Sequence, residues 1–192
     1  MCLLIGFKPP PSIEHRKKHC RMKGGISRLF DLQPDPYDCT QRQNIRICIF
    51  RDVKNAIELR SILQSGEIDA AMIRPELVAE PFVLLAAANR AIHQAAHNRI
   101  NISESLNIFG IAENSRNLIV AIFDDLHGKK MVKVAKKLKV KLGKPAPLET
   151  LRELADINLI KKVYQIAPQE PELNAATLAD SIITRIIAKD VA

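Results

Sequence analysis

Two short runs of aliphatic residues predict the central strands of the fold. IRICIF at 45–50 and LIVAIF at 118–123 are each about the length of one strand. The second run has no polar position, which predicts that it is buried on both faces. Between and after the two runs, apolar residues recur at helical spacing. The pattern therefore predicts strands interleaved with helices.

Helix signals follow the first strand. DVKNAIELRSILQSG predicts a helix that ends at Gly66, and Pro75 and Pro81 can each occupy the first position of a helix. The helix that Pro81 opens is long and spans 81–98. Its first half, residues 82–88, is apolar all round, so we expect that half to be enclosed.

The second half of the chain contains one ambiguous stretch. SESLNIF predicts a short helix with Ser103 or Asn101 as its cap and Gly110 at its end. KKMVKVAKKLKVKLGK fits a helix, but KLKVKL within it alternates like a strand, so periodicity leaves both open. LETLRELADINLIKKVYQI predicts one or two helical turns leading into a short strand, and Asn174 caps a final helix. We expect an α/β (α+β) fold, in which a small mixed or antiparallel sheet packs with helices in a single domain.

The final helix, AATLADSIITRIIAKD, has an unusually wide apolar face. It covers about 180°, whereas one core contact needs roughly 100°. Leu178 and Ile182 are predicted to be its deepest residues. The width fits either a helix that turns some isoleucines toward a partner or a helix set deep in a groove of its own domain.

The net charge of +8 is concentrated in two segments. Residues 1–27 carry +5 and residues 126–145 carry +8, so the rest of the chain sums to −5. A uniformly basic binding face is therefore not implied. Prolines and basic residues without periodicity predict that most of 1–44 is disordered and that the fold begins near Arg28. We thus divide the chain into a basic disordered extension, 1–27, and one domain, 28–192.

Composition excludes several classes of protein. Aromatic residues make up only 4% of the chain, which argues against base-stacking platforms. No stretch approaches the roughly 20 apolar residues of a membrane span, and MCLLIGF is too short for a signal peptide. The four cysteines lack paired spacing, which favours a reducing compartment.

Candidate catalytic and metal-binding residues do not form a set. HQAAH at 93–97 has the histidine spacing of a zinc-protease helix, but Gln94 stands where the catalytic acid is needed. Asp124 and Asp125 follow a predicted strand, where solvated acidic pairs are common. Glycine-rich phosphate loops and serine nucleophile elbows are absent from the sequence. We therefore expect no catalytic residue, no metal and no cofactor, and a protein that binds rather than an enzyme.

Several blocks of the sequence carry a family resemblance when taken in order. They are FRDVKNAIELRSILQSGEIDAAMIRPELVAEPFVLLAAANRAIH, NISESLNIFGI, LIVAIF, INLIKKVYQI and SIITRIIAKDV. Over about residues 28–192 the chain resembles the TPRKB family, the kinase-binding subunit of the KEOPS (EKC) complex. Family members usually carry a further strand between AAANRAIH and NISESL, where only QAAHNRI stands here, so one family strand is expected to be missing. The lysine density at 129–144 also exceeds the family pattern.

The resemblance implies a non-catalytic subunit that binds the small atypical kinase/ATPase of KEOPS and, through it, the other subunits. It also implies that the subunit helps to hold tRNA by its 3′ CCA end for threonylcarbamoyl-adenosine modification beside the anticodon. Cytoplasm and nucleus are the expected locations, with no membrane contact. Two alternatives stay open: a stand-alone basic RNA-binding module working through the lysines, and a small hydrolase using His93 and His97.

Site residues follow from the helix faces together with the resemblance. We predict that the kinase binds the outer isoleucines of the final helix: Ile183, Ile186 and Ile187. The polar stripe of the long helix is either an ordinary solvated face or the place for a tRNA end. The tRNA-binding residues predicted there and just before it are Arg74, Asn89, Arg90 and His93, with the lysines at 129–144 adding non-specific attraction.

Overall fold

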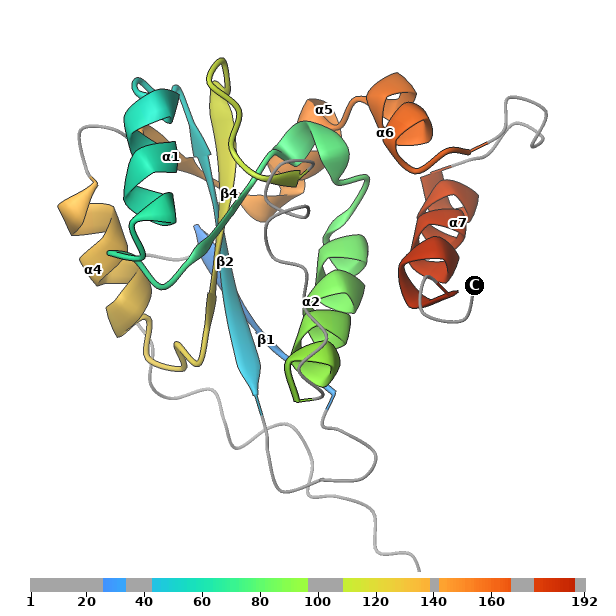
Figure 1. Ribbon diagram of the computed structural model, residues 1–192, viewed down its shortest axis with the longest axis horizontal. Coiled ribbons are helices and arrows are strands. Elements are labelled where there is room, and N and C mark those ends of the chain that lie inside the picture. The colour runs from blue at the N-terminus through green and yellow to red at the C-terminus, as the bar shows by residue number, and fades with distance from the viewer. Residues whose placement is uncertain (1–25, 34–42, 97–108, 139–141, 167–174, 189–192) are drawn as a thin grey trace, which may run out of the picture.

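A five-stranded antiparallel sheet forms the centre of the computed structural model (Figure 1). The structure describes residues 26–33, 43–96, 109–138, 142–166 and 175–188, without the side chains of 93–96 and 175–176. The strand order is β1-β2-β4-β3, and β5 pairs with β2. The predicted strands 45–50 and 118–123 are confirmed as β2 and β4. The bounds are β1 (Ser27–Asp31), β2 (Asn44–Arg51), β3 (Ala71–Ile73), β4 (Asn117–Phe123) and β5 (Lys144–Ala146).

One edge of β2 has two partners from distant parts of the chain. β1 pairs with residues 44–48 and β5 pairs with residues 49–51, so the two short strands lie end to end along β2. Gly143 makes the second pairing possible. Its φ is +75°, and a Cβ there would lie 2.1 Å from the carbonyl oxygen of Arg51. Neither short strand is predicted by the sequence pattern.

Alternate residues of β2 and β4 enter two different cores. On one face, Cys48 and Phe50 pack with α1 (Ala56–Gln64) and α4 (Lys129–Lys137). On the other face, Ile45, Ile47 and Ile49 pack with α2 (Pro81–Ala96) and α5 (Leu151–Leu154). Helices on both faces explain why these strands are buried at nearly every position, although the sheet is antiparallel.

A third layer lies outside α2. It consists of α6 (Ile157–Val163) and α7 (Ala175–Ala188), with α7 beside α2 and on the side of the molecule away from α1 and α4 (Figure 1). Short 3-10 turns, η2 (Pro75–Leu77) and η3 (Leu148–Thr150), lead into α2 and α5. The backbone N–H of Asp156 donates to the carbonyl of Glu76 at 3.0 Å, which ties the start of α6 to η2.

The strand predicted within INLIKKVYQI is wrong, because this segment forms α6. The Asp156 carboxylate accepts from the backbone N–H of Leu159 at 3.0 Å and caps the helix. Lys161 and Lys162 stand in its last turn, where positive charge favours a helix end. The capping aspartate and the terminal lysines therefore outweigh the strand preference of the β-branched residues in this segment.

Most of the other helix predictions are confirmed. α1 ends just before Gly66, whose φ is +73°, and Pro75 and Pro81 open η2 and α2. The final helix is α7, and the lysine stretch is helical over Lys129–Lys137. No helix in the described part of the chain is both long and apolar enough to cross a membrane. Predictions that lie outside the described residues concern the extension before residue 26, the end of the long helix at 97–98, residues 103–108 of SESLNIF with the candidate caps Asn101 and Ser103, the cap Asn174, and residues 139–141 of KLKVKL.

The expectation that residues 82–88 are enclosed on all sides is wrong. Phe82 is 59% exposed, whereas Val83, Leu84 and Ala88 are buried. α2 lies between two layers, so it has two packed faces: Leu84 and Ala88 join the sheet core, and Val83 joins the core beneath α7. Phe82 falls on the strip between those faces and stays in solvent.

Candidate functional site

The side of α7 that faces α2 forms a small core of its own. Leu178, Ala179 and Ile182 are almost fully buried there, together with Val83 of α2 and Ile160 of α6. This confirms Leu178 and Ile182 as the deepest residues of the final helix. The core fixes which side of α7 turns outward.

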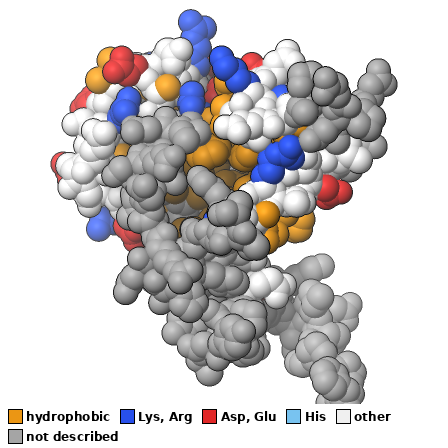
Figure 2. Space-filling view, turned by 45° about the vertical axis from the view of Figure 1, so that its right-hand side comes forward, with side chains coloured by type: hydrophobic (Ala, Val, Ile, Leu, Met, Phe, Trp, Pro, Cys, Tyr) orange, Lys and Arg blue, Asp and Glu red, His pale blue; other side chains and the backbone are white. Residues whose placement is uncertain are grey.

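An apolar edge remains at the surface of α7. Ile183 and Ile186 are half-buried at the rim of the core, and Ile187 is 61% exposed. These three residues are the predicted kinase-binding residues, and one helix brings them together. In Figure 2, which turns this side of the molecule forward, hydrophobic side chains reach the surface among lysine and arginine side chains. We call Ile183, Ile186 and Ile187 the isoleucine edge.

Polar side chains beside the isoleucine edge are bonded within α7. The Thr184 hydroxyl donates to the carbonyl of Asp180 at 2.8 Å. The Arg185 guanidinium donates to the carbonyl and the hydroxyl of Ser181 one turn earlier. These hydrogen bonds hold both side chains along their own helix, beside the isoleucine edge.

The predicted tRNA-binding residues lie in two parts of the chain. Arg74 lies between β3 and η2, and its backbone N–H donates to the carbonyl of Phe109 at 3.1 Å. Asn89 and Arg90 lie in the second half of α2, where the side-chain oxygen of Asn89 accepts from the backbone N–H of Gln33 at 3.1 Å. His93 belongs to the next turn of α2, but its side chain is outside the described part. Their role in binding tRNA stays a prediction.

Asp125 does not belong to a solvated acidic pair, contrary to expectation. Its side chain is 2% exposed, and its oxygens accept from the backbone N–H groups of Lys130 at 3.0 Å and Met131 at 2.8 Å. The Nε of Arg46 lies 3.5 Å from Oδ2 of Asp125. Asp124, in contrast, is exposed. Asp125 therefore holds the start of α4 and is occupied by the fold.

Arg46 is the partner that the sequence pattern missed. It is buried in the middle of β2, and its guanidinium donates to the carbonyls of Asp125 at 2.9 Å and Leu126 at 3.0 Å. The signal was available, since Arg46 is the one charged residue within IRICIF. A buried charge inside a strand requires a buried partner.

Two titratable groups in the described cores are shifted by burial. Burial raises the pKa of the Cys48 thiol to about 11 and that of the Tyr164 hydroxyl to about 12. Both groups are thus neutral at physiological pH and behave as core residues. No group of three or more metal-ligating side chains occurs among the residues that the structure describes, while both histidine side chains of HQAAH lie outside that part.

Comparisons with known proteins agree on one family. A family model described as "Kinase binding protein CGI-121" matches residues 50–101 and 98–190. The EKC/KEOPS complex subunit TPRKB of Danio rerio is 32% identical over 162 residues, covering 75% of this chain and 90% of the relative. The EKC/KEOPS complex subunit cgi121 of Aspergillus fumigatus is 30% identical over 144 residues, covering 64% and 76%. The EKC/KEOPS complex subunit CGI121 of Yarrowia lipolytica is 29% identical over 143 residues, covering 65% and 80%. The two parts of the family match overlap at 98–101, at the end of the segment where a family strand was expected to be missing.

Proposed function

The chain belongs to the CGI-121 family of kinase-binding proteins, and from this premise we propose that it is a non-catalytic subunit of an EKC/KEOPS complex. In this proposal it binds the small atypical kinase of the complex, and through that kinase the other subunits. The printed names of its relatives, all EKC/KEOPS subunits, support the assembly.

The isoleucine edge of α7 is the observation that carries the proposal. One side of α7 is packed against α2, and the other side keeps Ile187 in solvent with Ile183 and Ile186 beside it. Burying an isoleucine side chain contributes about 1.5–3 kcal/mol. A partner that covered this edge would gain that energy, and an apolar anchor of this kind is what the centre of a binding interface requires.

The test is an exposed charge placed on the edge. Ile187→Glu should weaken kinase binding at least tenfold, because a desolvated carboxylate would face the partner. Ile57→Glu is the matched control: Ile57 is 62% exposed, against 61% for Ile187, but it lies on α1 at the other side of the sheet. The affinity of both variants for the purified kinase would be measured by calorimetry, and their folding by thermal unfolding. Wild-type affinity of a folded Ile187→Glu variant would refute the proposed docking surface.

A role in holding tRNA, in the cytoplasm and nucleus, completes the proposal. It is supported by the polar stripe of α2, where Arg90 is the cation among the predicted residues. tRNA with an intact CCA end should bind more tightly than tRNA without it, and Arg90→Ala should remove that difference. If the wild type binds both RNAs equally, the tRNA-end role fails while kinase docking stands. A stand-alone RNA-binding module, the alternative, would neither bind the kinase nor respond to Ile187→Glu.

A further inference from the structure

The outer face of α4 is a second surface with a strong charge. Five of the nine residues of α4 are lysines, and the chain has no acidic residue from 126 to 148. α4 lies at one side of the molecule and α7 at the opposite side, with the sheet and α2 between them (Figure 1). The helix therefore has no part in the kinase-docking surface proposed above.

The lysines of α4 divide into two groups. Lys130 donates to the carbonyl of Phe123 at 3.0 Å and lies 3.8 Å from a carboxylate oxygen of Asp69, and Lys137 donates to Glu67 at 2.9 Å. The remaining three are exposed and have no hydrogen bond or ion pair with another residue of the described ranges: Lys129, Lys133 and Lys136. We call these three the lysine row.

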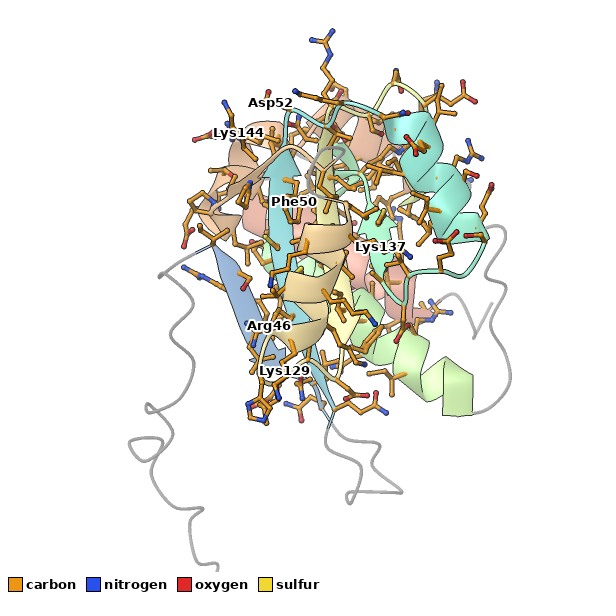
Figure 3. The ribbon with its side chains drawn as sticks, turned by 90° about the vertical axis from the view of Figure 1, so that its left-hand side faces the viewer. Arg46, Phe50, Asp52, Lys129, Lys137 and Lys144 are labelled. Atoms are coloured by element: carbon orange, nitrogen blue, oxygen red, sulfur yellow. The ribbon has the colours of Figure 1, made fainter. Side chains whose placement is uncertain are left out.

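Helix geometry places the lysine row directly opposite the core. Successive residues of a helix are about 100° apart around its axis. With Lys129 at 0°, Lys133 therefore lies at about 40° and Lys136 at about 340°. The buried residues of α4 and its cap fall near the other side of the circle, at about 140–200°: Met131, Val134 and Leu138. The row extends for about 10 Å along the axis. Figure 3 shows α4 facing the viewer, with Lys129 near one end and Lys137 near the other.

The helix dipole explains only Lys136 of the row, because this lysine stands in the last turn, where a cation is favourable. Lys129 and Lys130 stand in the first turn, where the positive end of the helix dipole disfavours a cation, and that turn has no acidic residue. Lys129 and Lys133 are like charges one turn apart, which also opposes the helix. Asp125 offsets part of this repulsion through its bonds to the first turn. A polyanion bound to the row would remove the remainder.

The chemistry of the row fits a phosphate backbone. Lysine binds phosphate as a point charge, without the bidentate geometry that reads bases. The apolar side of α4 is buried, so this helix has no free apolar face to insert into a lipid surface. We propose that the lysine row binds the sugar-phosphate backbone of RNA, on a face separate from the polar stripe of α2. The choice of RNA rests on the proposed function, in which tRNA is the substrate of the complex.

The consequence is that RNA and the kinase can bind the subunit at the same time. The lysine row and the isoleucine edge lie on opposite sides of the molecule, so neither partner covers the other's surface (Figure 1). The row adds affinity without sequence preference, while any recognition of the tRNA end comes from elsewhere. Neutralising the row should therefore weaken tRNA with and without CCA by the same factor.

The experiment compares two triple variants of equal charge. The row variant carries glutamine in place of Lys129, Lys133 and Lys136. The control variant carries glutamine in place of three exposed lysines outside α4: Lys54, Lys144 and Lys162. The dissociation constant of a tRNA transcript would be measured over a range of KCl concentrations by fluorescence anisotropy, with the full-length chain.

The row variant loses three phosphate contacts. Its log affinity should therefore fall less steeply with log salt, by about 2 in the slope, and its binding should be about tenfold or more weaker near 0.1 M salt. The control variant should stay close to the wild type. Equal losses in the two variants would overturn the proposal and leave only the effect of net charge. Polyglutamate that binds the wild type as tightly as RNA of equal charge would also overturn it, and would point to an acidic protein partner.

Kinase binding by the row variant separates this proposal from the proposed function. If the row variant loses RNA but keeps the kinase, both stand. If the wild type binds RNA through the row but binds no kinase, the row stands and the proposed function fails. If the kinase binds and RNA does not, the row fails and docking through α7 stands.

Discussion

Removing the negative charge of the buried Asp125 should strongly destabilise the protein. Asp125→Asn leaves the Arg46 guanidinium, 5% exposed, without its counter-charge. Removing one member of a buried ion pair costs about 3–5 kcal/mol. The side-chain oxygen of the asparagine can still accept from one backbone N–H of α4. Its NH2 group faces the other backbone N–H, so one hydrogen bond is lost at a further cost of about 1 kcal/mol.

The two costs overlap, and Arg46 keeps its bonds to two carbonyls, so the lower end of the range applies. We expect Asp125→Asn to lower the free energy of unfolding by about 3 kcal/mol, which corresponds to about 6–12 °C in Tm for a chain of this size. Asp124→Asn is the control. Asp124 is exposed and has a φ of +54°, a conformation that asparagine tolerates, so its change should stay within about 0.5 kcal/mol.

Urea unfolding followed by circular dichroism measures the difference. The midpoint should fall for Asp125→Asn while the m-value is unchanged. Arg46→Met in the same background tests the cause, because replacing both charges should cost less than the sum of the two single changes. A loss below about 1 kcal/mol for Asp125→Asn, or strict additivity in the double variant, would refute the role of the ion pair.

Two further predictions concern the backbone and the core. Gly143→Ala should detach β5 from β2 and cost several kcal/mol, because its Cβ would meet the carbonyl of Arg51. Gly66→Ala is the control, because Gly66 also has a positive φ but has open space where the Cβ would lie, so this change should cost only about 1 kcal/mol. Equal urea midpoints for the two variants would contradict the steric explanation. Cys48 should resist a thiol reagent in the folded protein, once the other three cysteines are replaced by serine. Because burial raises the pKa of this thiol from 9.0 to about 11, its contribution to the free energy of unfolding is complete below pH 9.0 and is lost as the pH rises toward about 11. The fall in stability over this pH range should be smaller in Cys48→Ala.

Sequence patterns located the parts of the fold that local chemistry decides. β2 and β4 are apolar runs, and Gly66, Pro75 and Pro81 mark helix boundaries for steric reasons that act within a few residues. β1 and β5 could not be found in this way. SRLFD and KPA have no strand pattern of their own and become strands only because β2 offers an edge to them.

The candidate site shows the same division between local and tertiary information. The width of the apolar face predicted that α7 has more than one contact, and the structure shows which isoleucines form its exposed edge. The pairing of Arg46 with Asp125 spans 79 positions, so no periodicity could reveal it. The outward direction of the lysine row also depended on knowing which side of α4 meets the sheet, since KKMVKVAKKLKVKLGK alone fits two structures.

The shared edge of β2 also protects the protein from self-association. β2 is eight residues long and rich in isoleucine, which is the kind of strand that recruits a second copy when its edge is free. Here β1 and β5 cover that edge along its whole length, and the strands left at the outside have only five or three residues. A chain shortened to begin after β1 would uncover residues 44–48. Aggregation through β2, rather than simple unfolding, is the failure that such a truncation would bring.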